Sequence, residues 1–372
     1  MINESVQIEQ GKLYQIRHQA TKLYLKGTIH FIVEKKLFST KELDEYYLGT
    51  SIKEEDFYTY FIFEKYLPTD NNIELGNIVS ILNYGQQYYV SLNKDKKSEV
   101  TNQCYAYLGQ EKHYFIIQPE KDVFASNINS IETSIKNNLV RFTSIHNGYS
   151  LHSHFNTYKT EKVAQYHEVT GYKNQDENDL WEIIPVKENS IKNFIPKIKK
   201  YEPIQIFNED IIILRNFWTG WALHSHQINY RSSKAQEVTL ACYEREQNDL
   251  WIITKLNIKE NDDGIIRRND EIVLQHKQTK KFLSWSNFLT YSQSGYQVQG
   301  LNSKPITGFQ LEYFENQPLR VNSPFLIKII NKNLYLSQQN IQTESKAGSQ
   351  KEAAFVQKFS GSCLWVVESR NK

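Results

Sequence analysis

The sequence predicts an all-β protein built from two closed barrels, and three observations lead to this prediction. A block of short strand-like runs with similar landmarks recurs along the chain, most clearly at 139–184 and 211–253. Each clear copy contains four such runs, which are separated by turn residues. The block can be traced six times within 372 residues, a length that suits two domains better than one core.

The two clear copies share their landmarks in the same order. The first reads LVRFTSIHNGYSLHSH, then YHEVTGY, then NDLWEII, and the second reads IIILRNFWTGWALHSH, then QEVTLACY, then NDLWIIT. From Leu151 to Trp181 is 30 residues, and from Leu223 to Trp251 is 28. Each copy predicts a first strand, a tight Asn-Gly or Thr-Gly turn, an LHSH strand, a polar loop, an EVT strand and a strand that begins with Leu-Trp.

Four weaker copies follow the same template. The unit at 12–63 contains KLYQIRHQATKLYLKG and FYTYFIF, and the unit at 77–117 contains NIVSILNYGQQYYVSLN and HYFII. The unit at 271–314 contains EIVLQHKQTKKFLSWSNF, YQVQG and FQLEYF. The unit at 325–367 contains FLIKIINKNLYLSQQN, QKEAAFV and CLWVV.

The division of six units into two sets of three predicts the architecture. A single unit cannot bury its apolar face, whereas three units that close into a barrel capped by hairpins leave no open sheet edge. An open solenoid is the alternative, but it needs polar caps that we do not recognise in the sequence. We therefore expect a first domain at 1–187 and a second at 209–372. The segment 188–208, which contains Pro196 and Pro203, is expected to link them.

Composition argues against several classes of function. Lysine plus arginine (44) nearly balances aspartate plus glutamate (42), so the net charge of +2 provides no field that attracts nucleic acid. The three cysteines, Cys104, Cys242 and Cys363, are far apart and lack CxxC spacing, so neither a disulfide framework nor a zinc site is expected. No run approaches about 18 apolar residues, and the amino terminus lacks the pattern of a signal peptide. A cytoplasmic protein without membrane insertion is expected.

At LHSH with EVT and NDLW, the sequence resembles the MIR domain. This module is shared by protein O-mannosyltransferases, inositol-trisphosphate receptors, ryanodine receptors and stromal-cell-derived-factor-2-like proteins. The resemblance is close over 139–254 and loose over the carboxyl third. It implies that three units form one β-trefoil, so that the six MIR-like repeats form two tandem β-trefoils. It also implies a recognition module, used for glycans, for inositol phosphate or for packing against other proteins.

The sequence departs from the family pattern in two respects. The units at 12–63, 77–117 and 271–314 lack His-Ser-His, so a ligand site that needs this signature is expected only in the two clear units. The family's inositol-phosphate receptors use a helical domain after the trefoils, and no such domain follows Ser369. Inositol-phosphate signalling is therefore not expected.

The histidines of the two LHSH strands are the most conspicuous polar residues. His152 and His154 are two residues apart, as are His224 and His226, so both members of each pair face the same side of a strand. A structural role, in which the imidazole bonds a turn or a neighbouring loop, is the simplest interpretation, and ligand contact is the alternative. A metal site is not expected, because zinc needs three or four converging ligands and the two pairs belong to different units.

The tryptophans divide into two groups. Trp181, Trp251 and Trp365 recur at one register beside a leucine, which predicts that they lie in the core. Trp218 and Trp221 fall in or beside a hairpin turn of the fourth unit. An exposed indole there could stack on a sugar ring or anchor a protein partner, so both are candidate binding residues.

The remaining polar groups give weaker indications. Arg231 and Lys234, with the lysines of the linker, form a basic cluster that could contact an acidic partner. The acidic loops at 174–179 and 244–249 are explained by turn propensity, so catalysis by paired carboxylates is not expected. No phosphate loop, nucleophile elbow or cysteine–histidine motif is recognisable, and no cofactor is expected.

These features predict a protein that is not an enzyme. The leading hypothesis is a structural or adaptor protein that docks onto a larger cytoplasmic protein assembly. The composition, rich in Asn, Lys, Ile, Tyr and Gln, is typical of AT-rich protist genomes and extends this hypothesis to a cilium or axoneme. The alternative is a lectin-like module of the secretory pathway that binds a glycan or a small ligand.

Overall fold

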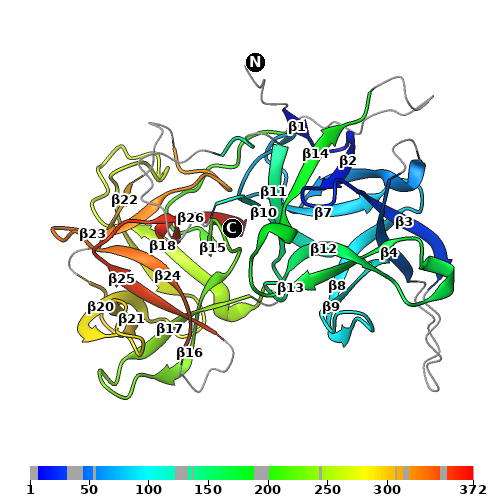
Figure 1. Cartoon of the computed structure of the whole chain (residues 1–372). Helices are drawn as coiled ribbons and strands as arrows, with labels where there is room; N and C mark the ends of the chain where they lie inside the picture. Colours follow the sequence, from blue (N-terminus) through cyan, green and yellow to red (C-terminus); the bar gives the residue numbers. More distant parts are fainter. Residues whose placement is uncertain are drawn as a thin grey trace, which may run out of the picture. The chain divides into compact units, whose positions relative to one another are not determined.

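The computed structural model describes ten stretches of the chain, and within them the regular structure is strand apart from single turns of 3₁₀ helix (Figure 1). The all-β prediction is therefore confirmed. None of the helical turns in these stretches has the length or apolar character needed to cross a membrane. The described residues are 7–31, 45–52, 56–121, 133–135, 138–187, 201–242, 245–305, 308–312, 318–343 and 350–371.

The chain forms two compact units, one made of Met1–Lys121 with Glu132–Tyr201 and the other containing Glu202–Lys372. The lysines predicted in the linker lie outside the described residues, which resume at Tyr201. Strands of the first unit are β1 (Ile8–Glu9), β2 (Leu13–His18), β3 (Tyr24–Phe31), β4 (Tyr46–Ser51), β5 (Tyr60–Lys65), β6 (Asn72–Ile73), β7 (Ile78–Asn83), β8 (Tyr88–Lys97), β9 (Cys104–Gly109), β10 (Tyr114–Pro119), β11 (Leu139–Ser144), β12 (Ser150–Thr157), β13 (His167–Tyr172) and β14 (Trp181–Pro185). Strands of the second unit are β15 (Ile211–Asn216), β16 (Ala222–Asn229), β17 (Gln236–Ala241), β18 (Leu250–Lys255), β19 (Glu271–His276), β20 (Phe282–Leu289), β21 (Tyr296–Leu301), β22 (Phe309–Glu312), β23 (Leu326–Ile329), β24 (Tyr335–Gln342), β25 (Lys351–Val356) and β26 (Trp365–Asn371).

The first unit is a β-trefoil. Six of its strands close into a barrel by antiparallel pairing in the order β2, β5, β7, β10, β11 and β14, with β14 returning to β2. Three hairpins, β3–β4, β8–β9 and β12–β13, complete the three repeats. The second strands of these hairpins pair with one another as a triangle, so the hairpins form a cap with threefold pseudosymmetry.

The second unit repeats this topology and is also a β-trefoil. Its barrel runs through β15, β18, β19, β22 and β23, and β26 pairs back with β15. A bridge between Phe325 and Trp365 joins the start of β23 to β26 and completes the ring. The cap consists of the hairpins β16–β17, β20–β21 and β24–β25, whose second strands again meet pairwise. The predicted pair of three-unit β-trefoils is confirmed.

One turn conformation recurs after the first strand of every unit. In the two clear units the turn residue is Gly148 (φ 73°) or Gly220 (φ 74°), as the Asn-Gly and Thr-Gly pairs predict. The other four units place a longer residue in the same left-handed region, with φ between 59° and 62°. These residues are Lys22, Gln87, Lys280 and Asn331. The repeat is therefore preserved in backbone geometry where the glycine is lost.

The predicted core tryptophans are fully buried, at 0% exposure, which confirms their assignment. Each indole donates its Nε1–H to the backbone carbonyl of the leucine that opens the hairpin of its own unit. The bonds run from Trp181 to Leu151 (2.8 Å), from Trp251 to Leu223 (3.0 Å) and from Trp365 to Leu336 (2.9 Å). The indole thus ties the hairpin to the barrel in three of the six units.

A second recurring bond joins neighbouring units. One partner is the last residue of a unit's first strand, which bonds through its side chain. The other partner is the loop that precedes the last strand of the preceding unit. Five of the six unit junctions have this bond, which we call the junction bond; in the sixth, the corresponding residue is Ile329. The five are His18 with the Asn178 carbonyl (2.9 Å), Asn83 with the Tyr58 carbonyl (2.7 Å), Ser144 with His113 (2.8 Å), Asn216 with the Ser362 carbonyl (2.9 Å) and His276 with the Asn248 carbonyl (3.1 Å).

Replacement of Trp365 by phenylalanine is expected to lower the free energy of unfolding by roughly 2–4 kcal/mol, because the buried Leu336 carbonyl loses its donor and the smaller ring leaves a cavity. Urea denaturation of the full chain, followed by circular dichroism, measures this change. Trp285→Phe is the control, since Trp285 is only partly buried and its replacement should have a smaller effect. An unchanged denaturation curve for Trp365→Phe would contradict the assigned role.

Candidate functional site

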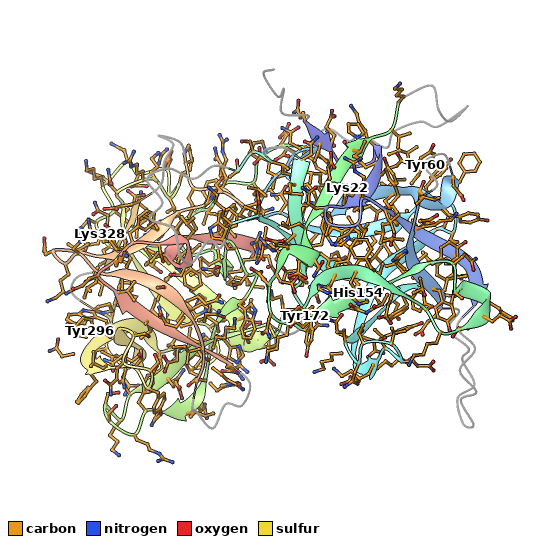
Figure 2. All side chains as sticks on the ribbon, viewed as in Figure 1. Lys22, Tyr60, His154, Tyr172, Tyr296 and Lys328 are labelled. Atoms are coloured by element: carbon orange, nitrogen blue, oxygen red, sulfur yellow. The ribbon has the colours of Figure 1, made fainter. Side chains whose placement is uncertain are left out.

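Each β-trefoil contains one polar cluster built on its LHSH strand. The first histidine cluster lies between β12, the 3₁₀ turn η4 (Glu177–Asp179) and the end of β2. The second lies between β16, the turn η6 (Gln247–Asp249) and the end of β19. Both clusters therefore sit where one repeat meets the next around the barrel. Figure 2 labels His154 and Tyr172 beside the first cluster.

In the first histidine cluster, His152 holds the turn η4. Its Nδ1 lies 2.9 Å from Oδ1 of Asp179, and both side chains are buried. The other carboxylate oxygen of Asp179 accepts the backbone N–H of Asp176 at 2.9 Å, and the side chain of Asp176 caps the same turn. Burial raises the pKa of the Asp179 carboxyl, and the bond from His152 opposes that rise. This arrangement matches the structural role expected for His152.

His154 faces the buried carboxylate of Glu168. Its Nδ1 accepts the backbone N–H of Asn156, and its Nε2 lies 3.5 Å from Oε2 of Glu168. Burial lowers the pKa of His154 to about 4, so the ring is neutral at pH 7. Glu168 also accepts hydroxyl bonds from Ser98 and Thr101, which belong to the loop of the neighbouring hairpin. The cluster therefore joins two hairpins of the cap.

In the second histidine cluster the two histidines contact each other directly. Nδ1 of His224 lies 2.7 Å from Asp249, and its Nε2 lies 3.1 Å from Nε2 of His226. Burial, followed by the neighbouring His224, lowers the pKa of His226. The side-chain amide of Gln350 donates to Nε2 of His226 at 2.9 Å. These histidines bond neighbouring protein groups instead of pointing into open solvent.

His18 and His276 complete the two clusters, and the sequence reasoning missed both. Each is fully buried and donates its Nε2–H to a backbone carbonyl of the turn η4 or η6 in a junction bond. Its ring centroid lies 5.0 Å from that of the core tryptophan of the preceding unit. A signal was present, because both occur as His-x-x-Thr-Lys after the first strand, and the threonine hydroxyl bonds Nδ1 in each case. The units that contain His18 and His276 lack the His-Ser-His signature, so the sequence pattern did not link these histidines to the LHSH strands.

The predicted exposure of Trp218 and Trp221 is wrong. Their side chains are only 3% and 9% exposed. The turn that carries them folds inward, so that Phe217 packs edge-on against Trp218 at 4.6 Å and the ammonium group of Lys351 covers the Trp221 ring at 4.7 Å. Arg231 is exposed beside the tip of the β16–β17 hairpin, and its contact with a partner stays a prediction.

Among the described residues, one group brings three metal-ligating atoms within 4.8 Å of one another: His152, Asp176 and Asp179. The same oxygens accept the backbone bonds of the capped turn and the bond from His152. Turn capping thus explains this geometry without an ion. The LHSH pair of each β-trefoil bonds its own turn, and the expectation of no metal site stays a prediction.

The three cysteines carry free thiols, and all are buried. Burial raises the pKa of Cys104 to about 11 and also raises that of Cys363. A thiol becomes a nucleophile only as the thiolate. These two cysteines are therefore not activated for nucleophilic chemistry.

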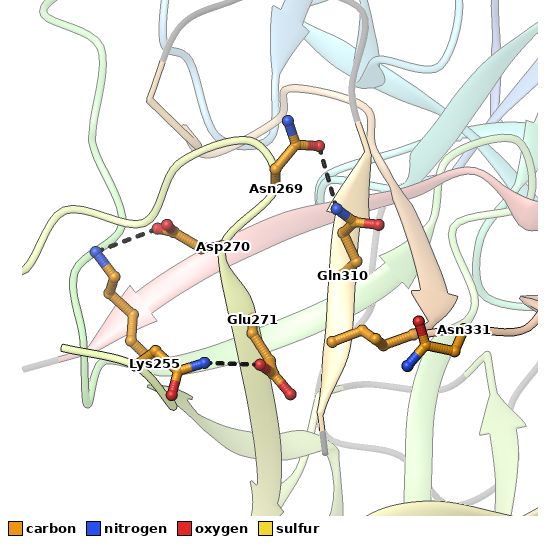
Figure 3. Close-up of a pocket in the computed structure, with 8 residues that line it drawn as sticks. Lys255, Asn269, Asp270, Glu271, Gln310 and Asn331 are labelled. Carbon is orange, nitrogen blue, oxygen red and sulfur yellow. Dashed lines mark hydrogen bonds and ion pairs between the residues drawn. The ribbon is translucent and has the colours of Figure 1, made fainter.

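Two open pockets lie on the second β-trefoil. The polar pocket has a volume of about 450 Å³ (Figure 3). Its charges are paired within the protein, since Lys255 contacts Asp262 at 2.6 Å and Asp270 at 3.3 Å, while Glu271 accepts from Asn257. It is lined by Lys255, Asn257, Asn269, Asp270, Glu271, Gln310, Ile330 and Asn331.

The second pocket, which we call the tryptophan pocket, has a volume of about 340 Å³. It differs from the polar pocket because it contains two aromatic rings and no carboxylate. Its lining is Trp285, Asn287, Tyr296, Lys332, Asn333, Leu334 and Gln357. None of these residues was predicted from the sequence to be a binding residue.

The buried junction histidines make stability depend on pH. Burial lowers the pKa of His18 and of His276 to about 4, whereas the unfolded value is about 6.5. The unfolded chain therefore binds more protons between these values, and the free energy of unfolding should fall as the pH falls from about 6.5 to about 4, by up to about 3 kcal/mol for each histidine. Urea denaturation over pH 4 to 7 measures the slope.

The matched variant for this experiment is His276→Asn, because asparagine makes the junction bond at Asn83 and Asn216. This variant should show a shallower dependence on pH than the unmodified chain while remaining folded at pH 7. An identical slope in both proteins would show that His276 does not titrate on unfolding as described.

Comparisons with known proteins concern the fold alone. No protein-family model matches the chain, and no curated protein matches it. The chain is similar to the crystal structure of an SDF2-like protein from Arabidopsis thaliana, with 21% identity, a TM-score of 0.43 and coverage of 45% of this chain and 97% of that one. It is also similar to a Caenorhabditis elegans protein of unknown function (24%, TM-score 0.42, 44% and 96%). A third similar structure is the S. cerevisiae protein O-mannosyltransferase Pmt1-Pmt2 complex bound to the sugar donor (19%, TM-score 0.41, 49% and 27%).

Proposed function

We propose that the chain is a non-catalytic adaptor protein of the MIR type that docks onto a larger protein assembly through its first β-trefoil. The observation that carries this proposal is a group of three half-buried tyrosines on the cap of that unit. We call it the tyrosine face, and it consists of Tyr47, Tyr105 and Tyr107.

The tyrosine face follows from strand alternation. Along β9, buried residues alternate with the half-buried Tyr105 and Tyr107, so the two rings project away from the core and stack at 6.2 Å. Tyr47 on β4 is the register partner of Tyr107, and its ring meets Tyr105 edge-on at 6.5 Å. Beneath them, the buried Tyr158 packs against Tyr47 at 5.4 Å. The rings thus form one connected, supported surface.

Such a surface suits protein recognition. Tyrosine offers a large, rigid contact area with a polar end, and it loses little side-chain entropy when it is bound. Tyrosine is also enriched in protein interfaces. In the second β-trefoil the equivalent positions on β21 are Gln297 and Gln299, which are buried. The tyrosines are therefore not required by the fold, which supports a role in binding.

The place of this assembly is a further part of the proposal. We place it in the cytoplasm, with a cilium or axoneme as a specific case. Its support is the composition of the sequence and the spacing of its cysteines.

A second candidate function is the binding of a glycan or another small polar ligand. The tryptophan pocket favours it, since two aromatic rings and three side-chain amides surround an open cavity. This function would use the second β-trefoil and is independent of the tyrosine face.

The adaptor proposal is tested with the full chain as bait in soluble and cytoskeletal fractions of its source cells. The double variant Tyr105→Ser with Tyr107→Ser should lose about tenfold or more of the retained partner, because it removes two aromatic contacts from the centre of the interface. Quantitative mass spectrometry of the retained proteins gives the ratio.

The control is Tyr335→Ser, which changes a half-buried tyrosine of the second β-trefoil. It should retain the same partner as the unmodified chain. Recovery of the chain as a free monomer, or equal retention by the double variant, would refute docking through the tyrosine face.

A further inference from the structure

The tryptophan pocket is formed by neighbouring repeats of the second β-trefoil. β20 supplies Trp285, β21 supplies Tyr296, and the turn before β24 supplies Lys332. The Trp285 and Tyr296 rings meet nearly at right angles, with centroids 6.0 Å apart, and both pack against the core. Figure 2 labels Tyr296 at this site. The aromatic wall is therefore held in place from behind.

A partly exposed indole at this position is not required by the fold. The equivalent positions in the other two hairpins of this β-trefoil hold Ser225 and Gln338. Both are fully buried and polar, whereas Trp285 is only partly buried and lines a cavity. Trp285 thus departs from the repeat pattern and supplies an aromatic surface to the pocket. A ligand that stacks in the pocket needs such a surface.

The tryptophan pocket and the polar pocket differ in how their charged groups are paired. Within the described residues, no carboxylate lies within ion-pair distance of Lys332, and its ammonium group rests over the Trp285 ring at 4.7 Å. In the polar pocket, by contrast, Lys255 contacts two aspartates. The tryptophan pocket thus offers one cation without an acidic partner, surrounded by the neutral amides of Asn287, Asn333 and Gln357.

We infer that the tryptophan pocket binds a sugar that carries a carboxylate, such as a hexuronic acid residue. The C–H face of a pyranose ring stacks on Trp285, and the side-chain amides exchange hydrogen bonds with its hydroxyls. A neutral sugar that stacks on Trp285 has to displace the Lys332 ammonium group from the indole, and it offers that ammonium group no new charged partner. A carboxylate gives Lys332 a charge-assisted hydrogen bond in return, so the acidic sugar is preferred. This inference deepens the second candidate function and names its ligand class.

The test compares methyl β-glucuronide with methyl β-glucoside on the full chain. The observed signal is the indole N–H resonance of Trp285 in NMR spectra, assigned by its loss in Trp285→Phe. At low salt the glucuronide should bind about tenfold tighter or more than the glucoside, and in Lys332→Met this preference should fall below about threefold.

Lys351→Met is the matched control. Lys351 covers the Trp221 ring at 4.7 Å, the same distance as at Lys332 and Trp285, but lies outside the pocket. It should therefore keep the full preference. Sodium acetate serves as a further probe and should bind at least about tenfold more weakly than the glucuronide, because it cannot stack on the indole.

Three results would overturn the inference: equal affinity for both glycosides, a preference that survives Lys332→Met, or no movement of the Trp285 resonance with either sugar. Tighter binding of the glucoside alone would leave glycan binding standing while refuting the acidic ligand. The partner retained through the tyrosine face should be unaffected by Lys332→Met, so failure of this inference is distinguishable from failure of the adaptor proposal.

Discussion

The junction bond is the interaction on which the rest of each β-trefoil depends. A repeat of four strands cannot bury its apolar face alone, so it must lie in fixed register against the next repeat. At five of the six junctions, the last residue of a repeat's first strand bonds, through its side chain, the loop before the last strand of the preceding repeat. The residue type varies among histidine, asparagine and serine, while the position is preserved. At four junctions this bond satisfies a backbone carbonyl of the preceding repeat.

The role of the LHSH strand follows from the junction. His152 and His224 bond the aspartates of the turns η4 and η6, and His18 and His276 reach the backbone of the same turns from the next repeat. Each turn is thereby held from two sides. The most conspicuous motif of the sequence therefore makes bonds within its own β-trefoil. Both proposed surfaces occur where one repeat departs from its equivalents: at Tyr105 with Tyr107, and at Trp285.

The sequence predicted the fold well because the features that define it are local. The recurring Leu-Trp pair predicted that three tryptophans lie in the core, and the glycines of two turns predicted the turn positions in the two clear units. The candidate site was predicted less well, because burial depends on contacts between repeats. Trp218 was placed at an exposed tip, whereas its turn folds inward against Phe217. The link between His18 and the LHSH strand, more than 130 residues apart in sequence, arises only when β14 pairs with β2.

Backbone hydrogen exchange of the full chain, measured by NMR, tests the closure of the barrels most directly. The strands that close the rings, β2 with β14 and β15 with β26, are joined across the longest sequence separations in each unit. If the barrels are closed and held by junction bonds, the paired amides of these four strands should exchange as slowly as those of β7 and β19, which are other strands of the two barrels. Fast exchange at these four strands beside protected hairpins would show open sheets and contradict the account.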